Sequence, residues 1–262
     1  MHLRPLLALL VAAGFASAVE IRESAVTVTE GGTTLTGHAY TPAGAKAGVL
    51  VVHEWWGRNA YADRRAKELA EEGYATIAVD LYGEAPSDDF PTAVRRSGAF
   101  YQDPSLFTRR LQPFLAALKA TPGVEADHLA AIGYCFGGSA VLQAARAGLD
   151  LKAVVAFHPG LKTAAPATTT PKAAILVCHG GSDPFVPPAD VAGFFQEMTA
   201  VKADWSMQVY GQAVHAFSNP TAGQGVTNVP EGVPFAQAVH HDAQAEIASG
   251  AALRVFLRDH LR

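Results

Sequence analysis

Short apolar runs alternate with longer helical patterns along most of this chain. Six runs have the length and character of strands buried on both faces of a sheet: Gly48 to His53, Ala75 to Asp80, Leu129 to Tyr134, Ala153 to Phe157, Ala173 to Cys178 and Trp205 to Tyr210. Between most of them we expect helices, at Ala60–Glu72, Pro91–Ala120, Gly137–Ala147, Pro188–Val201 and Pro234–Leu261. This alternation predicts an α/β protein with a mainly parallel sheet covered on both faces.

Two β-rich runs precede this alternation, and a long loop follows its last strand. Ala25–Thr29 and Thr33–Tyr40 flank Gly31-Gly32, which predicts an antiparallel hairpin at one edge of the sheet. The Gly-rich stretch Asn219–Gly232 is a loop long enough to form a lid or a pocket wall. Since no repeat or charge block divides the chain, we expect one domain over residues 19–262.

The first 18 residues have the pattern of a secretory signal peptide. Arg4 precedes the apolar stretch Pro5 to Val19, which contains Ala16-Ser17-Ala18. A membrane anchor is the alternative, but this stretch is shorter than the roughly 18 to 20 residues that a membrane span needs. We expect residues 1–18 to be cleaved and the mature chain to be secreted, in a bacterium to the periplasm, with no membrane span.

Composition narrows the classes of function and partner. The 262 residues are 49% hydrophobic and 17% charged, which excludes a disordered chain and a coiled coil. The formal net charge is -4 and no segment concentrates Lys and Arg, so we expect no nucleic acid partner. Two cysteines are too few for a disulfide framework or a cysteine-built metal site. The oligomeric state stays open.

Cys135 lies in the segment Gly133-Tyr134-Cys135-Phe136-Gly137-Gly138, which has the pattern of a nucleophile elbow. So sharp a strand-turn-helix strains its central residue and crowds neighbouring Cβ atoms, so that glycine is required two places to either side. The Cys135 side chain is then exposed at a helix N-terminus, which favours the thiolate, and the N–H of Phe136 points to where an oxyanion forms. The alternative is a tight glycine turn with an inert cysteine.

An acid and a histidine follow the elbow in the order that this architecture uses. Asp183 comes just after the predicted strand that ends at Cys178, and His215 lies in the loop before the final helix. The alternatives are an Asp183 that caps a turn before Pro184 and a solvated loop histidine.

The segment His53-Glu54-Trp55-Trp56-Gly57 directly follows another predicted strand. A carboxylate among aromatic neighbours is costly to bury unless it is paired, which favours a functional role for Glu54. The N–H of Trp55 is placed to be a second oxyanion donor. His53 and Glu54 could suggest a metal site, but no further ligands have fitting spacing, so we expect no metal and no cofactor.

Cys178 ends an apolar run, which favours a buried core residue. If the strand Ala153–Phe157 lies between the two cysteines, their sulfurs are about 9 to 10 Å apart, beyond the reach of a disulfide. We therefore expect no bridge to Cys135.

Together these residues resemble the dienelactone hydrolase family, a cysteine-nucleophile branch of the α/β-hydrolase fold. The resemblance covers nearly the whole mature chain, and the elbow is its most specific part. Further support comes from Glu54 with Gly57, Asp80-Leu81-Tyr82, Gly181 to Asp183 with Phe185-Val186-Pro187, and His215 with Phe217. The resemblance implies a triad of Cys135, His215 and Asp183. It also implies that the Glu54 carboxylate contacts the resting thiol and helps to generate the thiolate when substrate binds.

Two positions depart from that family. In the chlorocatechol-pathway enzymes, one arginine lies two places after the tyrosine of the Asp-Leu-Tyr segment and another lies four places after the catalytic histidine, and both hold the lactone carboxylate. Glu84 and Asn219 occupy these positions here. The loss of both arginines disfavours an anionic ligand. We therefore expect this protein to share the hydrolytic chemistry of the family but not the anionic lactone substrate. The secretory signal is a further departure, because the dienelactone enzymes are cytoplasmic.

The sequence thus predicts an exported hydrolase of small esters or lactones that forms a thioester on Cys135. Aromatic side chains near strand ends predict an apolar pocket for a neutral substrate, although such residues are also common in cores: Trp55, Trp56, Tyr82, Phe136 and Phe217. Two alternatives stay open. One is a thiol sensor in which Cys135 is oxidised or alkylated without turnover, and the other is a binding module that has lost activity.

Overall fold

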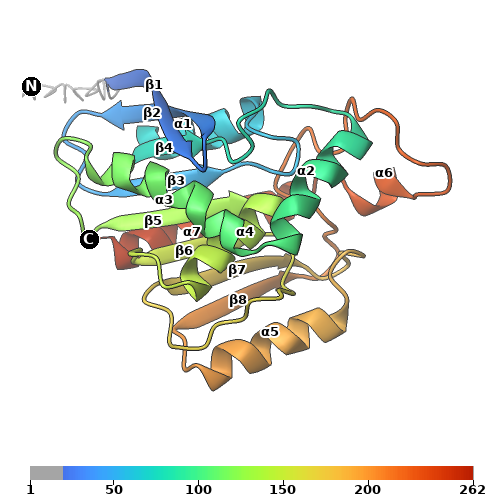
Figure 1. Ribbon diagram of the computed structural model, residues 1–262. Coiled ribbons are helices and arrows are strands. Elements are labelled where there is room, and N and C mark those ends of the chain that lie inside the picture. The colour runs from blue at the N-terminus through green and yellow to red at the C-terminus, as the bar shows by residue number, and fades with distance from the viewer. Residues whose placement is uncertain (1–19, 262) are drawn as a thin grey trace, which may run out of the picture.

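A single eight-stranded sheet forms the centre of the molecule, in the order β1-β2-β4-β3-β5-β6-β7-β8. The structure is a computed structural model and describes residues 20–261, so the expected signal peptide lies outside the described residues (Figure 1). The strands are β1 (Ile21–Glu30), β2 (Thr33–Pro42), β3 (Gly48–Val52), β4 (Ala75–Val79), β5 (Leu129–Tyr134), β6 (Ala153–Phe157), β7 (Ala174–Gly180) and β8 (Trp205–Tyr210).

The direction of the strands agrees with the sequence pattern. β1 and β2 form an antiparallel hairpin at one edge, and β2 is antiparallel to β4. From β4 to β8 every neighbouring pair is parallel. The predicted mainly parallel sheet with an edge hairpin is therefore confirmed, with hairpin strands longer than expected. Because parallel strands end at the same edge, the residues that follow them gather there.

Helices cover both faces of this sheet. α3 (Ser105–Lys119), α4 (Phe136–Arg146) and α5 (Pro188–Ala200) cover one face, and α1 (Ala60–Glu71) and α7 (Ala243–His260) cover the other. Alternate residues of each central strand serve the two sides: Leu50 and Val52 pack toward α3 and α4, while Val49 and Val51 pack toward α1 and α7. This double burial explains why the central strands are almost continuously apolar.

Two predicted helices are broken in the structure. The helix expected over Pro91–Ala120 is α2 (Phe90–Gln102) followed by α3, because Pro104 lacks an N–H and disfavours the helical conformation at Asp103. The helix expected over Pro234–Leu261 is α6 (Phe235–Ala238) followed by α7, because Val239 forms a β-bridge with His215. Asp242 then caps α7 by accepting from the N–H groups of Gln244 and Ala245.

β8 also differs from its prediction. It is the edge strand opposite the hairpin, and its side chains are partly buried or exposed instead of being buried on both faces. No helix among residues 20–261 combines the length and apolar character that a membrane crossing requires.

Candidate active site

Cys135 sits at a strained turn between β5 and α4, with φ 55° and ψ -115°. A Cβ on Gly133 would overlap the carbonyl oxygen of Gly137, and one on Gly137 would overlap the carbonyl oxygen of Val52. Both positions therefore require glycine for lack of space, as the elbow pattern predicts. The turn leaves Cys135 partly exposed at the N-terminus of α4.

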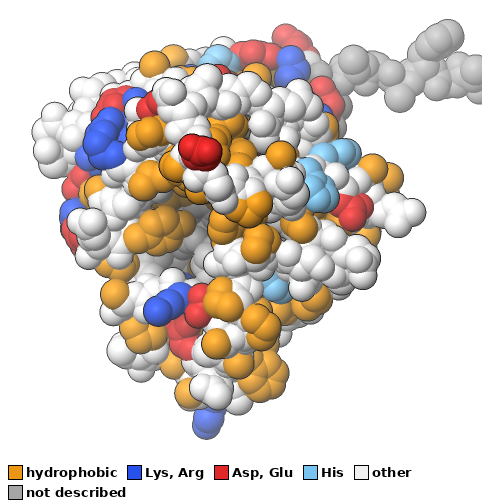
Figure 2. Space-filling model, turned by 90° about the vertical axis from the view of Figure 1, so that its right-hand side faces the viewer, with side chains coloured by type: hydrophobic (Ala, Val, Ile, Leu, Met, Phe, Trp, Pro, Cys, Tyr) orange, Lys and Arg blue, Asp and Glu red, His pale blue; other side chains and the backbone are white. Residues whose placement is uncertain are grey.

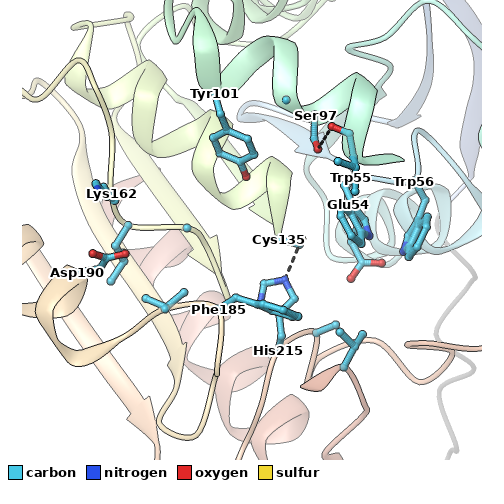
Figure 3. Close-up of a pocket in the computed structure, with 17 residues that line it drawn as sticks. Glu54, Trp55, Trp56, Ser97, Tyr101, Cys135, Lys162, Phe185, Asp190 and His215 are labelled. Atoms are coloured by element: carbon cyan, nitrogen blue, oxygen red, sulfur yellow. Dashed lines mark hydrogen bonds between the residues drawn. The ribbon is translucent and has the colours of Figure 1, made fainter. Parts of the chain in front are cut away.

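The thiol of Cys135 lies at the start of a short hydrogen-bonded relay (Figure 3). Its Sγ is 2.9 Å from Nε2 of His215, and Nδ1 of His215 is 2.7 Å from Oδ2 of Asp183. The Asp183 side chain is fully buried, and its Oδ1 accepts the N–H of Phe185 at 2.9 Å. His215 is fixed through its backbone, whose N–H donates to the carbonyl of Ala238 at 3.1 Å. The structure thus brings together the three residues that the sequence order suggested.

The surroundings of His215 favour its protonated form. Burial lowers the pKa of the imidazole. Negative charge on Cys135 and the hydrogen bond to Asp183 raise it, and together these raising effects exceed the effect of burial, so that the pKa lies well above its ordinary value. A protonated His215 next to Cys135 would stabilise negative charge on that sulfur, which a nucleophilic thiol needs.

Two backbone N–H groups are free to hold an oxyanion beside the thiol. Phe136 is the first residue of α4, where N–H groups lack partners within the helix, and Trp55 lies in the turn after β3. Neither N–H donates a hydrogen bond to another group among residues 20–261. The end of β3 packs directly on the start of α4, so the structure brings these two turns together. The side chain of Phe136, in contrast, is fully buried.

Glu54 is buried beside the relay, with its Oε2 accepting from Nδ2 of Asn219 at 2.8 Å. Burial raises the pKa of Glu54 to about 7, against smaller lowering effects of Asn219 and His215. The family resemblance implied a contact between this carboxylate and the resting thiol. In the structure the thiol contacts His215 instead, and Glu54 contacts Asn219.

A cavity of about 430 Å³ opens over Cys135. Glu54, Trp55 and Trp56 line it on one side and Cys135 and His215 at its base. Figure 2 shows a hollow on this face whose walls are mostly hydrophobic. Further lining residues were not predicted to line a pocket, because they lie on a helix or on loops: Val94, Ser97 and Tyr101 of α2, Leu161 and Lys162 after β6, and Phe185 and Asp190 around the start of α5.

Five residues expected at the pocket lie elsewhere, among them Phe136, whose side chain is fully buried. Tyr82 and Phe217 are core residues, and the hydroxyl of Tyr82 donates to the carbonyl of Trp55 at 3.1 Å. Glu84 is half exposed and forms an ion pair with Arg96 at 2.6 Å, outside the cavity. Asn219 is buried and reaches the cavity only through Glu54. No residue of 219–232 lines the cavity.

His158 is a residue of the site that the sequence analysis missed. It directly follows β6 and is fully buried, with Nδ1 accepting the N–H of Cys135 at 3.1 Å. Its Nε2 therefore carries the proton and donates to Oγ of Ser218 at 2.9 Å, and Ser218 also contacts the Tyr61 hydroxyl. Burial and the charge of His215 lower the pKa of His158 well below its ordinary value. A neutral imidazole thus ties the elbow to the loop that carries His215, and its position after a strand was the available signal.

The ring nitrogens of His53 are both engaged inside the protein. Nδ1 donates to the carbonyl of Glu54, and Nε2 accepts the N–H of Leu81 at 3.1 Å. Three side chains whose ligand atoms are close enough together to hold a metal ion do lie on the surface: Glu125, Asp127 and His128. This group precedes β5, whereas Cys135 follows that strand. The group is therefore at the amino ends of the parallel strands and Cys135 is at their carboxyl ends.

Cys178 is fully buried on β7, and burial raises the pKa of its thiol to about 12. β6 lies between β5 and β7, and both cysteines are free. The prediction of a buried, unbridged Cys178 is confirmed.

Known proteins match the chain in sequence and in structure. The sequence model of the Dienelactone hydrolase family matches residues 35–256. "Putative carboxymethylenebutenolidase" from Salmonella typhimurium is 30% identical over 188 residues, which cover 67% of this chain and 69% of that protein. "Uncharacterized protein K02A2.1" from Caenorhabditis elegans is 35% identical over 153 residues, which cover 57% of this chain and 91% of that protein.

Among solved structures, the "Dienelactone Hydrolase-like Promiscuous Phospotriesterase P91 from Metagenomic Libraries" has a TM-score of 0.83 and 33% sequence identity. The match covers 92% of this chain and 99% of that one. The predicted α/β-hydrolase fold is thereby confirmed across nearly all described residues.

Proposed function

We propose, from the premise that this chain belongs to the dienelactone hydrolase family, that it hydrolyses ester or lactone bonds with Cys135 as nucleophile. The observation that carries the proposal is the continuous relay from Sγ of Cys135 through His215 to Asp183, with steps of 2.9 and 2.7 Å. It opens into a cavity and has free N–H groups beside it, which is the arrangement that acyl transfer needs.

In the first half of the reaction the Cys135 thiolate attacks the substrate carbonyl carbon. The N–H groups of Trp55 and Phe136 hold the resulting oxyanion. When it collapses, the carbon–oxygen bond breaks and the leaving alkoxide takes the proton from Nε2 of His215. The acyl group stays on Cys135 as a thioester.

In the second half a water molecule gives a proton to Nε2 of His215 and attacks the thioester carbon. The carbon–sulfur bond breaks, the acid leaves and the Cys135 thiolate is restored beside protonated His215. Asp183 holds the imidazole in the required tautomer and stabilises its positive charge. We propose that Glu54, whose carboxyl group lines the cavity, helps to keep the Cys135 thiol deprotonated when substrate binds.

The substrate group next to Cys135 is proposed to be uncharged and at least partly apolar. Trp55, Trp56 and Phe185 contribute to the cavity wall, and Glu54 disfavours an anion close to the thiol. The relatives named carboxymethylenebutenolidase support lactones as one substrate type.

Hydrolysis of p-nitrophenyl esters and enol lactones tests the proposal. We expect turnover that is lost in Cys135→Ala and strongly reduced in Cys135→Ser, while Cys178→Ala, the matched removal of the other cysteine, keeps it. A stable mass adduct on Cys135 without turnover would instead support the thiol sensor, and neither adduct nor turnover would support the binding module.

We also propose that residues 1–18 are a signal peptide and that the mature protein works in the periplasm. Their pattern of one basic residue, an apolar stretch and a small-residue cleavage site supports this. The mass of the protein recovered from the periplasmic fraction tests it, because cleavage before Val19 gives one defined mass.

A further inference from the structure

A second cavity of about 350 Å³ adjoins the candidate active site. Tyr101, Gly160 and Lys162 line both cavities, so the two share a wall. The Tyr101 side chain forms part of that wall, and its hydroxyl is only loosely held, 3.4 Å from Oγ of Ser139 (Figure 3). The two cavities are thus direct neighbours that meet at these three residues.

The wall of the second cavity contains no carboxylate, and the hydroxyl groups of Ser139 and Thr163 donate within the protein, to the carbonyl of Gly160 and to Oε1 of Gln143. Its polar members are Tyr101, Ser139, Gln143, Arg146, Lys162 and Thr163. Ser139, Gln143 and Arg146 are buried, so their positions are fixed. The first cavity differs, since the carboxyl groups of Glu54 and Asp190 lie on its wall.

The positive charge at this shared wall comes mainly from Lys162. Nε and Nη2 of Arg146 each donate to Glu197 at 2.8 Å, which offsets the guanidinium charge. Lys162, in contrast, forms no ion pair among residues 20–261, and Asp190 also lines the first cavity (Figure 3). Nη1 of Arg146 also donates to no group among these residues. The second cavity thus offers an unpaired ammonium group and spare N–H donors.

We propose that the second cavity binds the carboxylate end of an extended substrate whose ester bond lies at Cys135. The inference rests on the proposed function and names its substrate class: esters with an uncharged segment beside the thiol and a carboxylate several bonds away, such as half-esters of longer dicarboxylic acids. A carboxylate only accepts hydrogen bonds, which matches the Lys162 ammonium group and the unused N–H groups on Nη1 of Arg146, and Asp190 directs it away from the first cavity.

This cation is in a different place from the two arginines that the family resemblance implied. Glu84 and Asn219 occupy those positions here, outside the cavity wall, whereas Lys162 lies on the loop after β6. The sequence predicts that no anion binds next to the reacting bond. The proposed anion site is farther from that bond, so it is compatible with this prediction.

Two ester series of increasing length test the proposal. One carries the carboxylate on the acyl side, as mono-p-nitrophenyl esters of dicarboxylic acids, and the other on the alcohol side, as acetates of ω-hydroxy acids. Each is compared with its uncharged methyl-capped equivalent. We expect kcat/KM for the anionic ester to exceed that of its equivalent by about tenfold in one series once the chain spans the shared wall.

Lys162→Gln should abolish this preference and Lys162→Glu should reverse it, each measured as the ratio of kcat/KM for the anionic ester to that for its methyl-capped equivalent in the same variant. Lys172→Gln is the matched control, because Lys172 is exposed, paired with Asp150 and absent from both cavities. Cys135-dependent acetate turnover without a length-dependent preference in either series would overturn this proposal and leave the proposed function standing.

A binding measurement keeps the two proposals separate when no ester is turned over. In Cys135→Ala, calorimetry with the mono-methyl ester of a long dicarboxylic acid should give a Kd that rises about tenfold on adding Lys162→Gln. Equal affinity with and without Lys162, or no binding at all, would overturn the second-cavity proposal.

Discussion

Replacing Glu54 by glutamine should change how the stability of the protein depends on pH. Burial raises the pKa of Glu54 from its ordinary 4.5 to about 7. Between these values the unfolded chain releases a proton that the folded protein retains, so folding stability falls as the pH rises. Below pH 4.5 both states are protonated and the penalty vanishes, and above pH 7 it is constant.

The size of the effect follows from the two pKa values. For a shift from 4.5 to about 7, linkage gives a loss of about 2.5 kcal/mol in unfolding free energy between pH 5 and pH 8. Glutamine keeps an oxygen that can accept from Asn219 and carries no charge, so Glu54→Gln removes the loss without removing the hydrogen bond.

Urea unfolding at pH 5 and at pH 8, monitored by tryptophan fluorescence, measures this change in unfolding free energy. The stability of Glu54→Gln relative to the unmodified protein should rise by about 2.5 kcal/mol from pH 5 to pH 8, because titrations common to both proteins cancel. Glu84→Gln is the control, since its side chain is half exposed and its pH dependence should match that of the unmodified protein. A Glu54→Gln difference that is the same at both pH values would refute the reasoning.

Three further substitutions test the site. Gly137→Ala places a methyl group against the carbonyl oxygen of Val52, so we expect a loss of at least about 3 kcal/mol in urea unfolding and no activity; full activity would contradict the close contact. Asp183→Asn should lower kcat by about 10³ to 10⁴ because His215 loses its charged partner, and circular dichroism should show an unchanged fold. His158→Phe keeps an aromatic ring but leaves the N–H of Cys135 only the carbonyl of Phe157 as acceptor and removes the link to Ser218, so kcat/KM should fall by about tenfold; unchanged kinetics would show that His158 has no positioning role.

The chain itself determined the strands, most helices and the elbow, because each depends on residues close together in sequence. An apolar run such as Ala153–Phe157 predicts a doubly buried strand wherever it lies in a parallel sheet. Gly133 and Gly137 are needed on either side of Cys135 for reasons of space within one turn. Asp183 and His215 follow strands whose carboxyl ends meet, so their order along the chain indicated their approach to the thiol.

Only the tertiary structure decided the wall of the cavity and the breaks in two helices. Tyr101 and Lys162 lie on a helix and a loop whose position over Cys135 is set by packing between distant segments, and no local pattern marks them. Tyr82 and Phe217 show the converse, because an aromatic residue near a strand end has the same local pattern whether it faces a cavity or the core. The helix before α7 ends because Val239 pairs with a residue far away in sequence, a contact that helix propensity does not include.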